Sequence, residues 1–176
     1  MDAPRRPGDN PPMADPLRIA LGKMLDEYDE RRRGDLAREQ QVRDEDAAFL
    51  AQFAELRRNV VRPVFEAAGA MLAERGHEFS ISEDEFAVGE GGKVTEAGIS
   101  LHIVPSGMSS RLHADDHGRS LSFSTRHYNK TVWINSGVAM NAGGVAGSKG
   151  AFPLARIDRP RVEEELLKFV AGVIAG

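Results

Sequence analysis

The sequence predicts an α+β fold in which an N-terminal helical hairpin joins a small antiparallel sheet of about four strands, with a C-terminal helix closing the chain. Two apolar stripes with helical spacing occupy the first half of the chain. Short segments with two-residue alternation then follow one another without an intervening helix, and a third helical stripe ends the sequence. Strands that are consecutive along the chain, rather than alternating with helices, are typical of an antiparallel sheet.

The composition indicates one globular domain and excludes several classes of site. The chain has 176 residues, no cysteine, and 23 Lys and Arg against 27 Asp and Glu. A chain of this length buries about 70% of its unfolded surface, so a core can form without cross-links. The lack of cysteine excludes a disulfide framework, a thiolate metal site and a cysteine nucleophile. The net charge of -4 argues against a dedicated nucleic-acid-binding protein.

We predict that residues 1–15 form a disordered tail and that residues 16–176 form a single domain. The tail is rich in proline and charge and nearly free of large apolar residues, unlike a secretory signal. No apolar run reaches the roughly 20 residues that a membrane-spanning helix needs. We therefore expect a cytoplasmic protein without membrane contact. The preference for Arg over Lys and the abundance of Ala are typical of a GC-rich bacterial genome.

The first helix is expected to begin near Pro16. Its apolar residues recur at steps of four, three and four, at Leu17, Leu21, Met24 and Tyr28. Residues 29–47 contain only two large apolar side chains, so this stretch is either a solvated helix with ion pairs or a break around Gly34. The three arginines at 31–33 are surrounded by acids, which indicates an exposed segment whose charges compensate one another.

A second helix is predicted from about Glu45 to Arg75, with Gly76 as its C-terminal stop. Its stripe runs through Phe49, Phe53, Leu56, Val60, Val64 and Phe65. Pro63 falls inside this helix and lacks a backbone N–H, so we expect a kink near Asn59 or two abutting helices. Residues 16–76 would then form the helical hairpin.

The antiparallel sheet is expected within residues 77–136. Its apolar residues share one parity and predict a single buried face, at Ile99, Leu101, Ile103, Leu121, Phe123, Val132 and Ile134. Residues 137–158 contain a cluster of glycines and are expected to form a flexible loop. The last helix is predicted from Arg159 to Ala175, with Asp158 as its N-cap.

None of the sequence motifs specifies a catalytic or cofactor site. His113, Asp116 and His117 are residue types that bind metals, but they lack a helical ligand spacing and lie in a predicted loop, so no metal is expected. The glycine-rich segments GEGGK and GGVAGSKG do not match the phosphate-binding loop pattern. The chain has no GxSxG motif for a nucleophilic serine. These observations favour a non-enzymatic protein without a cofactor.

Trp133 is the most informative residue of the predicted sheet. Strand parity places it on the polar face together with His102, Ser124 and Arg126. Tryptophan is enriched at interface hot spots, so this residue is a candidate contact anchor. The structural alternative is that it covers the aliphatic part of the Arg126 side chain or lies under another element of its own chain.

The sequence therefore predicts a protein-protein interaction or assembly protein. Its partner would be another protein or a second copy in a homodimer, bound through the helical hairpin and the sheet face. The alternative is a small-molecule or metal-dependent ligand-binding protein. Such a protein would use the polar sheet face and the adjacent loop, with the side chains of His102, His127, Trp133, His113, Asp116 and His117.

Overall fold

The computed structural model describes residues 14–107, 119–138 and 145–175. The chain consists of two compact units, Met1–Asp44 and Glu45–Gly176. The α+β class predicted from the sequence is confirmed, because a long helical segment precedes an antiparallel sheet and a C-terminal helix. The predicted disordered tail lies outside the described residues, apart from its last two positions.

Residues 15–74 are helical throughout, so the expected hairpin does not form. Helix α1 extends over Asp15–Leu56, a π-helical turn over Arg57–Val61, and helix α2 over Arg62–Glu74. No turn separates the two apolar stripes, and the chain does not break at Gly34. A glycine inside a helix costs only about 1 kcal/mol relative to alanine, which the hydrogen bonds of a long helix easily tolerate.

A π-helical turn lies near Asn59, where the sequence predicted a kink or two abutting helices. Pro63 has no N–H to donate, and its ring would clash with the carbonyl four residues earlier in a regular α-helix. The backbone widens at this point, and the Arg62 N–H donates to the Arg57 carbonyl five residues back. The helix therefore accommodates the proline by a local π-helical turn instead of ending.

The main sheet has five antiparallel strands in the order β1-β4-β5-β6-β7. Their bounds are Glu78–Asp84, Gly98–Val104, Ser120–Arg126, Thr131–Val138 and Val145–Pro153. A separate two-stranded ribbon, β2 (Ala87–Val88) and β3 (Val94–Thr95), lies between β1 and β4 in sequence. Apart from this ribbon, each strand of the main sheet pairs with the strands that come before and after it in the sequence.

Strand β7 corrects the prediction of a flexible loop over residues 137–158 and raises the number of strands in the main sheet to five. It pairs with β6 along its length, with an irregularity in register between Ile134 and Asn135. Glycines weaken a strand on their own, but the paired edge of β6 supplies hydrogen-bond partners that local composition does not reveal. Near the irregularity, Gly150 has a φ of 107°, a conformation that suits glycine.

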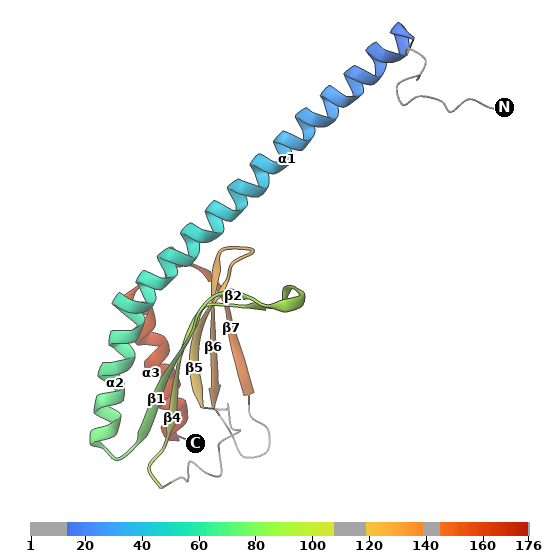
Figure 1. Ribbon diagram of the computed structural model, residues 1–176. Helices are drawn as coiled ribbons and strands as arrows, with labels where there is room; N and C mark the ends of the chain where they lie inside the picture. The colour runs from blue at the N-terminus through green and yellow to red at the C-terminus, as the bar shows by residue number, and fades with distance from the viewer. Residues whose placement is uncertain (1–13, 108–118, 139–144, 176) are drawn as a thin grey trace, which may run out of the picture. The chain divides into compact units, whose positions relative to one another are not determined.

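Helices α2 and α3 (Arg159–Ala175) cover one face of the sheet (Figure 1). The predicted bounds of α3 are confirmed, and Asp158 caps it by accepting a 3.0 Å hydrogen bond from the Arg161 N–H. The predicted apolar face of the sheet is buried at all seven positions, Ile99, Leu101, Ile103, Leu121, Phe123, Val132 and Ile134. Between the sheet and the helices, these residues meet Phe53, Phe65, Val162, Leu166 and Phe169 in one core.

Candidate interaction surfaces

The first candidate surface is the N-terminal stripe, which we define as Leu17, Leu21, Met24, Leu25 and Tyr28 of α1. The helical period places all five side chains on one side of the helix. All five are exposed to solvent, with 59% of Leu17, 64% of Met24 and 57% of Tyr28 accessible. Among the described residues up to Asp44, none is buried. The stripe is therefore an apolar surface that the described chain does not cover.

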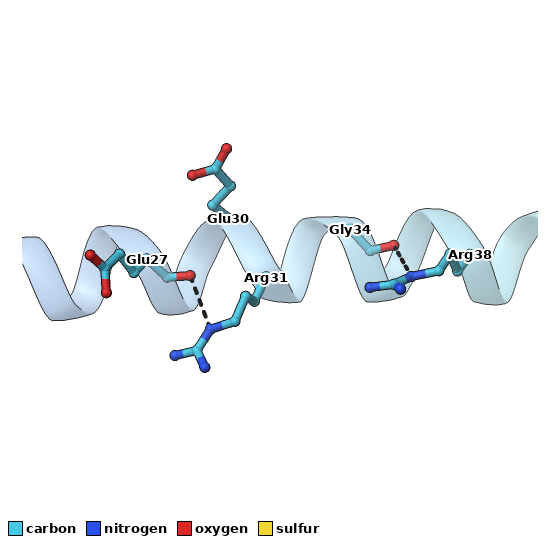
Figure 2. A pocket seen from close by; sticks show the side chains of 5 residues that line it. All are labelled: Glu27, Glu30, Arg31, Gly34 and Arg38. Carbon is cyan, nitrogen blue, oxygen red and sulfur yellow. Dashed lines mark hydrogen bonds between the residues drawn. The ribbon is translucent and has the colours of Figure 1, made fainter.

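The helix that follows the stripe is polar and compensates its own charges. Arg38 binds Asp35 at 2.7 Å, and the Nε atoms of Arg31 and Arg38 donate to backbone carbonyls four residues earlier. Figure 2 shows the five residues that line a shallow hollow on this helix, with the hydrogen bonds of Arg31 and Arg38 to the carbonyls of Glu27 and Gly34. All five lining residues belong to α1, so the hollow has no second wall. Its acidic and basic groups select neither an anion nor a cation.

The second candidate surface is the polar face of the sheet, where the structure places Trp133, Ser124, Arg126 and His102. Each of these side chains is half-buried. Trp133 lies directly opposite Ser124 on the neighbouring strand, and Ser124 in turn lies opposite Gly98. The structure therefore brings Trp133 and Ser124 together in one row across the sheet, as strand parity predicts.

Trp133 stacks with Arg126, so the contact expected as the structural alternative is present. The guanidinium carbon lies 4.9 Å from the centroid of the indole ring, a distance typical of a cation-π contact. The indole N–H is buried and meets no acceptor among the described residues. Much of the aromatic surface is therefore used within the chain, which weakens Trp133 as a contact anchor.

His102 lies on the same face but in a different row from Trp133. It pairs with Ser80 and Ser120, four residues along β4 from the position opposite Ser124. At about 3.3 Å per residue, the two rows are roughly 13 Å apart. The His102 ring is instead 3.4 Å from the Ser82 hydroxyl. The structure therefore does not bring His102 and Trp133 into one site.

A buried arginine connects the π-helical turn to the sheet. Arg57 donates to the carbonyls of Asp84 and Gly98 at 3.0 and 3.3 Å, and to the Glu85 carboxylate at 2.5 Å. Its side chain is 9% exposed and packs over Phe53. Charged donors form the stronger hydrogen bonds of proteins, so Arg57 fixes the adjacent ends of β1 and β4. The sequence signal for this buried contact is the position of Arg57, a charged residue four positions after Phe53 inside an apolar stripe.

The neighbouring Arg62 shares the acidic end of β1 with Arg57. It donates to Glu83 at 2.8 Å and to Glu66 at 2.9 Å. The hydrogen bond to Glu83 is the main cause that raises the pKa of Arg62 above its ordinary value. Because Arg62 is well exposed, this pair contributes little to stability compared with the buried Arg57.

A second polar cluster holds the base of the β2-β3 ribbon. Glu96 accepts a hydrogen bond from the Thr125 hydroxyl at 2.8 Å and lies 2.7 Å from Nδ1 of His127. The His127 ring packs edge-on against Phe86 and Tyr128. Thr125 is fully buried, and its hydroxyl also lies within hydrogen-bond distance of a backbone carbonyl. The cluster is thus an anchor for the ribbon, and its hydroxyl is inaccessible to a substrate.

The loop half of the alternative site, with His113, Asp116 and His117, lies outside the described residues. Within the described ranges, no group of three or more His, Asp or Glu side chains is arranged to hold a metal ion. His127, the remaining member of the alternative site, is engaged with Glu96 as described above.

None of the helices in the described part of the chain combines the length and the apolarity needed to cross a membrane. Comparison of the chain with protein-family models, with curated proteins and with solved structures finds no match.

Proposed function

We propose that this protein is a non-enzymatic assembly protein that associates with a second copy of itself through the N-terminal stripe of α1. The observation that carries the proposal is the exposure of five large apolar side chains on one side of a helix. Fully burying one such side chain is favourable by about 1.5–3 kcal/mol. A partner helix that covers the stripe therefore gains a substantial apolar contact.

The position of the stripe within a longer helix favours association. Isolated helices shorter than about 12–15 residues are marginal in water, because the first turn is costly to form. Here the stripe belongs to the same 42-residue helix as Phe49 and Phe53, whose side chains are buried in the core. The folded part of the chain thus supplies the helical nucleus, and less conformational entropy is lost when the stripe binds.

The expected affinity follows from the number of side chains that two copies contribute. Eight side chains at Leu17, Leu21, Met24 and Tyr28 would lose about half of their surface, which contributes roughly 10 kcal/mol in total. Loss of translational and rotational freedom offsets at least about 4 kcal/mol of this gain. At this lower limit of the cost, about 6 kcal/mol remains, which corresponds to a dissociation constant on the order of tens of micromolar. We therefore expect reversible dimerisation.

Paired substitutions on α1 test the proposal in the full-length chain. The double variant Leu21→Glu, Met24→Glu places two charges in the stripe and should remain a monomer in sedimentation velocity up to several hundred micromolar. The matched control is Ile19→Glu, because Ile19 is 73% exposed and lies about 200° around the helix from Leu17. This control should dimerise as the unmodified chain does. Equal dimerisation of the double variant and the control would refute the stripe as the interface.

A further inference from the structure

We infer that the two copies pair with their α1 helices antiparallel, so that Leu17 packs against Tyr28 of the second copy and Leu21 packs against its Met24. This inference depends on the proposed self-association and specifies the geometry of that contact. It makes the stripe a self-complementary surface related by a two-fold axis between Leu21 and Met24.

The spacing of the stripe is compatible with this arrangement. The steps from Leu17 to Tyr28 are four, three and four, and they read the same in either direction. Reversing one helix therefore superimposes the four seam positions on one another without a shift. The contact then consists of four apolar layers with no polar residue between them. In each layer, a seam side chain of one helix packs against a seam side chain of the other.

Charge favours the antiparallel pair, because a parallel pair would place identical charges together just beyond the stripe. The seam then continues at the same helical spacing through Arg31, Asp35 and Arg38. In a parallel pair, each of these three residues would face its own copy across the seam, and like charges in such layers are destabilising.

The antiparallel pair removes this repulsion. Because Leu17 lies beside Tyr28 of the second copy, Arg31 lies at the level of its Ala14, one residue before helix α1 begins at Asp15. Arg31, Asp35 and Arg38 therefore do not face their own copies across the seam. The Arg38–Asp35 ion pair of 2.7 Å is formed within one helix and needs no change.

The two orientations differ strongly in the distance between identical residues. In the antiparallel pair, the two Leu17 residues are separated by 11 positions along the helix axis, or about 16 Å at 1.5 Å per residue. A disulfide requires a Cα separation of about 4.4–6.8 Å. Cysteines at position 17 of both copies therefore cannot join in this arrangement, whereas cysteines at positions 17 and 28 can.

The absence of native cysteine makes disulfide formation a direct test. We would oxidise the full-length variants Leu17→Cys and Tyr28→Cys at several hundred micromolar, first separately and then mixed, with one of them carrying a mass tag. The antiparallel pair predicts a mixed 17–28 disulfide and little cross-linking of Leu17→Cys alone. A parallel pair predicts the reverse. Ile19→Cys, on the other side of the helix, is the control for random collision.

A distance measurement that leaves all four layers intact complements the cross-links. A spin label on Arg33→Cys is outside the seam, and the two labels would lie 21 positions apart along the antiparallel pair, or about 30 Å. A parallel pair places them within about 20 Å, given interaxial distances of 8–10 Å. A short distance together with a confirmed dimer would overturn the orientation alone. A monomer at every concentration would overturn both the orientation and the self-association.

Discussion

Replacing Arg57 with methionine should strongly destabilise the folded unit. The substitution keeps the aliphatic stem beside Phe53 and removes the guanidinium. It therefore breaks the hydrogen bonds to the carbonyls of Asp84 and Gly98. The lost bond to Glu85 matters less, because that carboxylate is 75% exposed and is rehydrated when its partner is removed.

The magnitude follows from the two carbonyls that lose a charged donor. A hydrogen bond to a charged group contributes about 1.5–3 kcal/mol, and a buried carbonyl without a donor keeps its desolvation penalty. We expect the free energy of unfolding to fall by about 3 kcal/mol. With a urea m-value of about 2 kcal/mol/M, the unfolding midpoint should fall by about 1.5 M. Arg57→Lys should recover only part of this loss, because one ammonium cannot reproduce the planar fork.

The matched control is Arg62→Met, which removes an arginine from the same helical segment and the same acidic neighbourhood. Arg62 is 42% exposed and is paired with Glu83 and Glu66. Exposed ion pairs contribute about 0–1 kcal/mol, so the midpoint should move by less than about 0.5 M. Equal midpoints for Arg57→Met and Arg62→Met in urea titrations would show that Arg57 does not hold the strand ends.

Three further predictions concern the sheet and its ribbon. Trp133→Ala should lower the urea midpoint less than Phe123→Ala, because Phe123 is fully buried and its truncation costs about 3–5 kcal/mol. The opposite order of the two midpoints would contradict the half-exposed position of Trp133. Gly69→Ala should destabilise the fold by up to about 2 kcal/mol, because overlap of the new methyl group with the Phe79 ring costs about 1–3 kcal/mol and alanine regains about 1 kcal/mol of helix propensity. A midpoint raised by the roughly 0.5 M that helix propensity alone predicts would contradict this packing. Glu96→Gln should accelerate amide hydrogen exchange in the β2-β3 ribbon while exchange in β5 stays slow, because the substitution weakens the bonds to the threonine and histidine that anchor the ribbon. An equal acceleration in the ribbon and in β5 would contradict a local anchor.

Features set by local periodicity could be predicted from the sequence. The parity of Leu121, Phe123, Val132 and Ile134 assigned the buried face correctly, because a slip by one residue would expose all of them at once. The C-terminal helix was predicted at its observed bounds, since its stripe and the Asp158 cap are both local signals.

Features that depend on partners distant in sequence could not be predicted. Strand β7 exists because β6 presents an edge for it, and its glycine-rich composition indicates the opposite. The continuous helix through Gly34 reflects the cooperativity of a long helix, whereas the local sequence left a solvated helix and a break around Gly34 as alternatives.

The candidate surfaces could likewise be predicted where local spacing determines them and could not where distant partners do. Helical spacing identified the N-terminal stripe, and strand parity placed Trp133 beside Ser124. The separation of His102 from Trp133 follows from the register of β4 against β5, which no local pattern encodes. Arg57 was missed for a similar reason, because the carbonyls that bind it belong to strands 27 and 41 residues further along the chain.

Association of two copies of this chain through the N-terminal stripe makes its molar mass depend on concentration. Light scattering of the unmodified 176-residue chain from about 1 to 500 µM measures this mass. We expect the mass to rise from one chain of 19.2 kDa towards two chains, with a midpoint on the order of tens of micromolar. A mass that stays at one chain across the whole range would contradict it.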